Sequence, residues 1–102
     1  MKAKDRQEII NYLSEHRSEL VNKYSLESIG IIGSIARDDY SILSDVDLMV
    51  RFKPGTDKIR DKKRDLSESL ESTFGRPVQI SSEKFLKPYY KESILNDAVY
   101  IR

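Results

Sequence analysis

The sequence contains no cysteine and only one histidine, His16. Disulfide bonds, thiolate metal sites, cysteine nucleophiles and histidine-rich zinc sites are therefore excluded, and nothing indicates an oxidising compartment. Long hydrophobic runs are also absent, and the polar N-terminal residues lead into no apolar segment. Because a membrane span needs about 20 apolar residues, we expect a cytoplasmic protein that makes no use of a membrane.

An excess of charge of one sign is missing too. The 102 residues include 18 Lys and Arg against 17 Asp and Glu, which leaves a formal net charge of +1. Bulk binding to nucleic acid needs a basic excess or a basic face, so this balance argues against nucleic acid as a partner. The length predicts one globular domain over residues 1–102, with a modest core and little room for a separate recognition domain.

Hydrophobic periodicity predicts a mixed α/β (α+β) domain. The predicted helices cover residues 5–23, 57–73 and 89–97, with short helical turns at 35–37 and within 82–87. The predicted strands cover residues 28–33, 45–52, 78–81 and 98–101, the last as an edge strand. Asp5 and Glu8 match a capping box at the first helix, and Gly75 matches the end of the second. This order predicts a small mixed sheet of about four strands covered by helices.

Two carboxylates lie two residues apart on the clearest strand. Alternate residues of a strand point to one face, so Asp45 and Asp47 are expected to project together, about 6.5–7 Å apart at Cα. The opposite face carries Val46, Leu48 and Val50, which anchor the strand in a core. Hard cations such as Mg²⁺ take oxygen ligands, so this pair predicts a metal site that would act on a phosphorylated substrate.

Gly33 and Ser34 follow the first predicted strand and supply the complementary half of a site. Glycine allows close approach of the backbone, and free amides at the start of the following turn favour an anion. Ten residues separate this pair from Asp45. A Gly-Ser pair after one strand and an Asp-x-Asp motif within the next is a far more specific signal than either alone.

The segment from Gly33 to Arg37, followed by Ser44 to Leu48, resembles the signature of the DNA polymerase beta-like nucleotidyltransferase superfamily. It is similar to the minimal nucleotidyltransferases that accompany HEPN-domain RNase toxins as antitoxins. The resemblance implies that Gly33 and Ser34 bind the phosphates of ATP and that Asp45 and Asp47 bind Mg²⁺ as catalytic residues. It also implies AMP transfer to a protein hydroxyl, which in the antitoxins is a toxin tyrosine.

The chain departs from that family pattern at two positions. The family usually has glycine where Asp38 follows Arg37, a change expected to affect the loop rather than the chemistry. The family also places a third carboxylate at the position of Gln79, on the strand after the second long helix. Glutamine offers a carbonyl oxygen but is neither charged nor a base. Glu83 is the candidate substitute, although it is expected to lie beyond the strand.

Other polar and aromatic residues carry two interpretations each. Arg37 either contacts a phosphate or pairs with a neighbouring aspartate, and Ser44 either contacts the nucleotide or hydrogen-bonds the loop backbone. Tyr89 and Tyr90 are expected to pack locally in a core rather than to face a partner.

Three hypotheses of function follow. The first is an ATP- and Mg²⁺-dependent transferase that places AMP on a HEPN toxin, with any oligomer formed through that partner. The second is a nucleotide-binding antitoxin that is catalytically weak or inactive and neutralises its partner by binding it, which Gln79 favours. The third is nucleotidyl transfer to a small molecule or to RNA.

Overall fold

The computed structural model describes residues 3–102. Four strands form one sheet in the order β3-β2-β1-β4. The strands are β1 (Leu26–Ile32), β2 (Val46–Phe52), β3 (Val78–Ser82) and β4 (Val99–Tyr100). Pairing of β1 with β2 and with β4 is antiparallel, whereas β2 and β3 are parallel. The predicted mixed sheet of about four strands is therefore confirmed, with β4 at one edge as expected.

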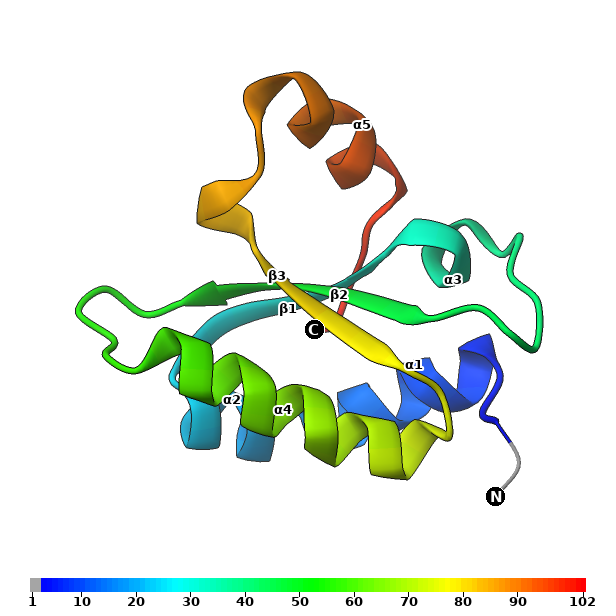
Figure 1. Ribbon diagram of the computed structural model, residues 1–102, viewed down its shortest axis with the longest axis horizontal. Coiled ribbons are helices and arrows are strands. Elements are labelled where there is room, and N and C mark those ends of the chain that lie inside the picture. Colours follow the sequence, from blue (N-terminus) through cyan, green and yellow to red (C-terminus); the bar gives the residue numbers. More distant parts are fainter. Residues whose placement is uncertain (1–2) are drawn as a thin grey trace.

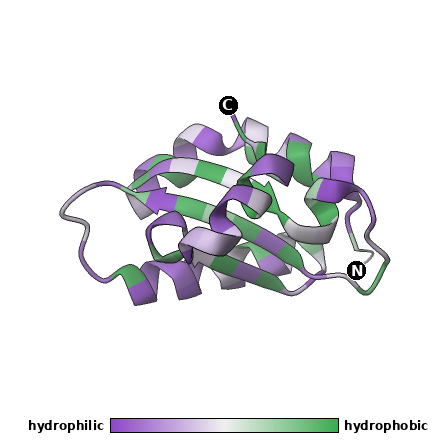
Figure 2. Ribbon diagram, turned by 90° about the horizontal axis from the view of Figure 1, so that it is seen from above, coloured by the Kyte–Doolittle hydropathy of each residue, from purple (hydrophilic) through white to green (hydrophobic). Residues whose placement is uncertain are grey.

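Helices cover the two faces of this sheet unequally. They are α1 (Arg6–Glu15), α2 (Arg17–Tyr24), α3 (Gly33–Arg37), α4 (Ile59–Phe74), the 3₁₀ helix η1 (Glu83–Phe85) and α5 (Pro88–Asp97). Figure 1 shows α1, α2 and α4 beneath the sheet and the short α3 and α5 above it. Figure 2 shows that the hydrophobic segments concentrate in the strands, while the helices and loops are mostly hydrophilic outside. Within residues 3–102, none of the helices is both long and apolar enough to cross a membrane.

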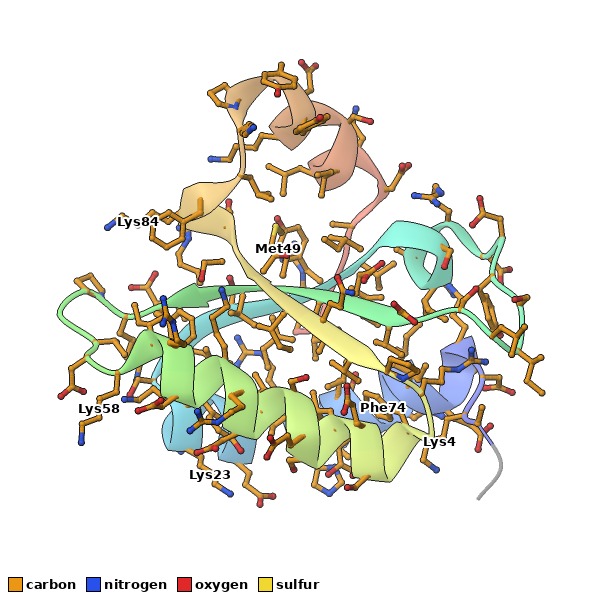
Figure 3. All side chains as sticks on the ribbon, viewed as in Figure 1. Lys4, Lys23, Met49, Lys58, Phe74 and Lys84 are labelled. Atoms are coloured by element: carbon orange, nitrogen blue, oxygen red, sulfur yellow. The ribbon has the colours of Figure 1, made fainter. Side chains whose placement is uncertain are left out.

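The main core fills the space between the sheet and the three lower helices. It joins apolar residues of the strands to one stripe from each helix, among them Leu13, Tyr24, Leu26, Leu48, Leu66 and Phe74. The upper face has a smaller buried region, in which Met49 is 1% exposed and points from the sheet toward α5 (Figure 3). The face that carries Asp47 is thus partly closed by α5 rather than open throughout.

The first predicted helix is in fact two helices, so that prediction was wrong. The backbone leaves helical geometry at His16 (φ −104°, ψ 10°), and α2 begins at the next residue. The Arg17 guanidinium donates to the carbonyl of Ile101 at 3.0 Å. Because α2 still buries Leu20 and Tyr24, the helical spacing of apolar residues continues across the break. The spacing alone therefore could not predict that the helix is interrupted. The capping box of Asp5 and Glu8 is present as predicted.

Tyr89 and Tyr90 were also placed wrongly. Their side chains are 71% and 52% exposed, and their rings contact each other with centroids 4.3 Å apart. α5 has no fully buried residue, since it covers the upper face only through half-buried side chains. These tyrosines therefore do not contribute to a core.

Arg76 is the buried charge on which the loop before β2 depends. The side chain is 6% exposed, and its guanidinium lies 5.4 Å from the ring of Tyr40. Its hydrogen-bond acceptors are the carbonyl oxygens of Lys4, Ser41, Ile42 and Ser44, at 2.8, 2.9, 3.1 and 3.0 Å. Carbonyls of an irregular loop have no strand or helix partners, so one guanidinium satisfies several of them and holds the chain that enters β2.

We expect Arg76→Ala to lower the free energy of unfolding by about 2–4 kcal/mol, because charge-assisted hydrogen bonds are lost and several partly buried carbonyls lose their donor. Urea denaturation measures this difference. Arg60→Ala removes the same charge from an exposed position of α4 and should change stability by no more than about 0.5 kcal/mol. Equal stability of the two variants would contradict the role assigned to Arg76.

Candidate active site

The strand register brings the motif residues to one edge of the sheet. Ile32, the last residue of β1, pairs with Asp47 across the antiparallel ladder. Asp47 in turn pairs with Gln79 of the parallel strand β3. Gly33 follows Ile32 and opens α3, and Asp45 immediately precedes β2. Residues that are distant in the sequence therefore meet where β1 ends and where β2 and β3 begin.

Gly33 is required here by both its conformation and its surroundings. Its φ is +73°, in the left-handed region that disfavours other residues. A Cβ at this position would lie 2.6 Å from Oδ2 of Asp47, far inside van der Waals contact. The sequence indicated that glycine lets a ligand approach the backbone. In the structure, the carboxylate of Asp47 occupies the space beside Gly33, so the two motif halves are in direct contact.

Asp47 is a carboxylate held in unfavourable surroundings. Burial raises its pKa above the ordinary value of 3.8, and the negative charge of Asp45 raises it further, while Arg37 acts in the opposite direction. The effect of Asp45 agrees with the expectation that the two carboxylates project together. A cation bound by both would relieve the repulsion that raises this pKa.

The donor set fits a hard cation with few protein ligands. Among residues 3–102, no three histidine, cysteine, aspartate or glutamate side chains gather in a group that could hold a metal. Two carboxylates with substrate phosphates and water suffice for Mg²⁺, which commonly keeps several non-protein ligands. The residues at this edge are therefore compatible with the expected metal.

Gln79 lies where the register predicts, beside Asp47, and its side chain is exposed. Glu83 does not replace it. Glu83 lies in η1 beyond the far end of β3, is 8% exposed, and accepts a hydrogen bond from Arg51 at 3.0 Å. Since β2 rises about 3.3 Å per residue, the four positions from Asp47 to Arg51 place Glu83 about 13 Å from this edge.

Asp38 adopts the backbone conformation that favours glycine, the residue expected at this position from the resemblance. Its φ is +63° and ψ +29°, a left-handed conformation that ends α3. Its N–H donates to the carbonyl of Ile35 at 3.2 Å. Aspartate tolerates this conformation better than most residues, at a cost of about 1 kcal/mol. The loop therefore keeps the turn that glycine would make.

Arg37 and Ser44 make local contacts in this structure. Arg37 pairs with Asp39, Nε to Oδ2, at 3.1 Å, and both side chains are about half exposed. The hydroxyl of Ser44 accepts a hydrogen bond from the N–H of Ser41 at 2.9 Å. The loop contact expected as the alternative for Ser44 is thus present. Contacts of either residue with a nucleotide stay predictions, as do those of Gly33 and Ser34.

Asp47→Asn should raise stability at neutral pH in the absence of metal. A carboxylate whose pKa is higher in the folded than in the unfolded protein stabilises the fold at pH values below the unfolded-state pKa. This contribution is lost as the pH rises through the folded-state pKa. The variant escapes this loss, because asparagine does not ionise. Urea denaturation in EDTA should therefore show a difference at pH 7 that shrinks as pH falls toward 3.8.

Asp65→Asn provides the matched control, since Asp65 is exposed on α4. Its stability relative to the wild type should not show the same pH dependence. An Asp47→Asn protein that is less stable than the wild type at pH 7 in EDTA would show that the carboxylate contributes favourable contacts.

Comparison with known proteins places this geometry in a family. The model of the nucleotidyltransferase domain family matches residues 13–101. A Methanocaldococcus jannaschii protein with a provisional assignment as a protein adenylyltransferase is 35% identical over 95 residues, which cover 92% of this chain and 95% of that protein. The protein adenylyltransferase MntA of Thermococcus cleftensis is 30% identical over 95 residues, 93% of this chain and 94% of that protein.

Solved structures agree. The structure of a minimal nucleotidyltransferase, 29% identical, superposes with a TM-score of 0.76 and covers 94% of this chain and 95% of its own. A chain from the Shewanella oneidensis complex of a tri-AMPylated HEPN toxin with an MNT antitoxin shares the fold at 15% identity and a TM-score of 0.63, over 91% of this chain and 71% of that chain. With its Gly33-Ser34 and Asp45-x-Asp47 motifs joined at one sheet edge, this chain belongs to the nucleotidyltransferase domain family, among the minimal nucleotidyltransferases.

Proposed function

We propose that this protein transfers AMP from ATP to a hydroxyl group of a partner protein. The observation that carries the proposal is the contact between Gly33 and Asp47, which unites a phosphate-binding turn with a carboxylate pair. Relatives at 30% identity or more over almost the whole chain are named as protein adenylyltransferases. We further propose a HEPN-domain toxin as the partner, with a tyrosine as acceptor, because a HEPN toxin complex contains a chain of this fold.

In the proposed reaction, the acceptor oxygen bonds to the α-phosphorus of ATP. The bond from this phosphorus to the oxygen that bridges it to the β-phosphorus breaks, and pyrophosphate leaves. The N–H groups in the first turn of α3 have no helical acceptors, so the backbone at Gly33 and Ser34 would bind phosphate oxygens together with the Ser34 hydroxyl. Breaking the exposed Arg37–Asp39 pair costs little, which allows Arg37 to turn toward a phosphate.

Asp45 and Asp47 would hold Mg²⁺, which supplies neutralising charge for the phosphates when it is bound. The raised pKa of Asp47 supports this assignment, because a bound cation would offset the repulsion from Asp45 that contributes to it. Gln79 provides no base, so the proton of the acceptor hydroxyl would pass to water. We propose the cytoplasm as the location, because ATP is the donor.

Binding without transfer and transfer to a small molecule or RNA are weaker candidates. The relatives that match most of the chain are named for transfer to proteins. Gln79 is therefore better interpreted as a cause of slow transfer than as a sign that transfer is lost.

The first test uses ATP labelled at the α-phosphate with Mg²⁺ and a candidate HEPN toxin, chosen first from the adjacent reading frame. We expect label on the toxin, and a loss of at least about 100-fold in rate with Asp45→Asn together with Asp47→Asn, because the phosphates lose their charge partner. Asp65→Asn with Asp61→Asn removes the same charge from α4 and should not change the rate. Transfer that survives in the site variant would refute the metal assignment.

The second test restores the missing carboxylate. Gln79→Glu places an acid beside Asp47, and we expect the rate of AMP transfer to rise by about 10- to 100-fold, because a base and a third ligand are added. Gln79→Met, of similar size but without an oxygen, tells whether the amide itself contributes. A Gln79→Glu enzyme no faster than the wild type would show that this position does not limit transfer.

A further inference from the structure

A second cavity lies at the opposite end of β2 and β3 from the carboxylates. Its volume is about 470 Å³, and it is lined by the end of β2, the loop after it, the first residue of α4, the end of β3, η1 and one residue of α5. This volume lies within the roughly 300–1,000 Å³ that is usual for small-molecule sites. The family motifs do not extend to this part of the chain.

The cavity concentrates positive charge in a protein that is nearly neutral. Four basic residues line it, and the one acidic residue among the lining side chains is Glu83. Glu83 is already paired with Arg51 at 3.0 Å. Within the described part of the chain, no carboxylate lies within salt-bridge distance of Lys53, Lys84 or Lys91. These three lysines are the kind of group that a phosphate binds.

Ser82 is a buried residue in the wall of this cavity, and its side chain lies on the same face of the sheet as that of its strand partner Val50. It lines the cavity, is 6% exposed, and its hydroxyl has no hydrogen-bond partner. Over residues 3–102, it is the single buried side-chain polar atom left in this state. Buried polar groups are nearly always satisfied, because desolvation without a partner is costly. The hydroxyl oxygen has almost no accessible surface, so a ligand in the cavity does not reach it in this conformation.

An aromatic ring stands at the same cavity. Phe85 is 69% exposed and is part of the lining, and Nζ of Lys84 lies 5.9 Å from the centre of its ring. Lys84 projects outward from the segment that follows β3 (Figure 3). Nucleobases stack on exposed aromatic side chains regardless of their identity. Lysines and an exposed aromatic ring together match a phosphate joined to an aromatic base.

We propose that this cavity binds a mononucleotide, with its phosphate at Lys84 and Lys91 and its base against Phe85. The site is separate from the carboxylate pair, since Arg51 and Asp47 are four residues apart on β2, about 13 Å along the strand. It goes beyond the proposed transfer and does not require it. The volume of the cavity suits a free nucleotide rather than a nucleic-acid strand.

The test measures AMP binding to the full chain by calorimetry in EDTA, where no divalent cation is available to the carboxylates. Lys84→Ala with Lys91→Ala should weaken binding by about tenfold or more, because two charged contacts to the phosphate are lost. Lys63→Ala with Lys87→Ala removes the same charge from residues outside the cavity and should leave the affinity within about twofold. Equal weakening in both pairs would overturn the proposal in favour of general charge attraction.

Two further variants separate this site from the proposed active site and from a structural role. Asp45→Asn with Asp47→Asn should retain AMP binding in EDTA, even if it abolishes transfer. Phe85→Ala should weaken AMP binding while the unliganded protein keeps its stability, because the ring of Phe85 is largely exposed. Amide resonances that shift on AMP addition should cluster at Ser82 to Phe85.

Shifts confined to Gly33 and Ser34 would overturn the proposal, as would the absence of binding at millimolar AMP.

Inorganic phosphate and a short single-stranded RNA complete the experiment. Phosphate alone should bind more weakly than AMP, since it cannot stack on Phe85. RNA that binds more tightly than AMP and fails to bind the Lys84 and Lys91 variant would replace the mononucleotide with nucleic acid as the ligand.

Discussion

The candidate active site depends on the antiparallel pairing of β1 with β2. That pairing sets Ile32 opposite Asp47, so the turn after β1 lies against the first carboxylate within β2. The contact is so close that only glycine fits at position 33. A shift of one residue in this register would turn Asp47 toward the core and Leu48 toward the site. The apolar face of β2, with Val46, Leu48 and Val50 buried, opposes such a shift.

The loop between α3 and β2 is held from outside its own sequence. Arg76, between α4 and β3, satisfies three of its carbonyl groups, and Asp38 makes the left-handed turn at its start. The strand edge and this loop therefore fix Asp45 and Asp47 from two sides. Rigid support of this kind holds two like charges close together, as the proposed cation site requires.

The two ends of β2 have opposite electrostatic character. Asp45 and Asp47 lie at its start, while Arg51 and Lys53 lie at its end, next to the lysines of η1 and α5. A net charge near zero conceals this separation. The even composition argued against nucleic acid as a partner, yet composition carries no information on where charges gather. The basic cavity is a local property that only the folded chain reveals.

Much of this protein followed from the sequence by itself. Period-two alternation located β2 and the face of Asp47, and turn residues located the ends of β1 and α4, because these signals are local. The spacing of Gly33-Ser34 and Asp45-x-Asp47 predicted a metal and phosphate site, and the resemblance of these motifs to a family signature indicated a nucleotidyltransferase. Only the tertiary structure decided the break at His16, the burial of Arg76, the pairing of Glu83 with Arg51 and the exposure of Tyr89. These features depend on contacts between residues far apart in the chain or on a single backbone angle. Contacts and angles of this kind produce no periodic pattern in the sequence, so the sequence could not predict them.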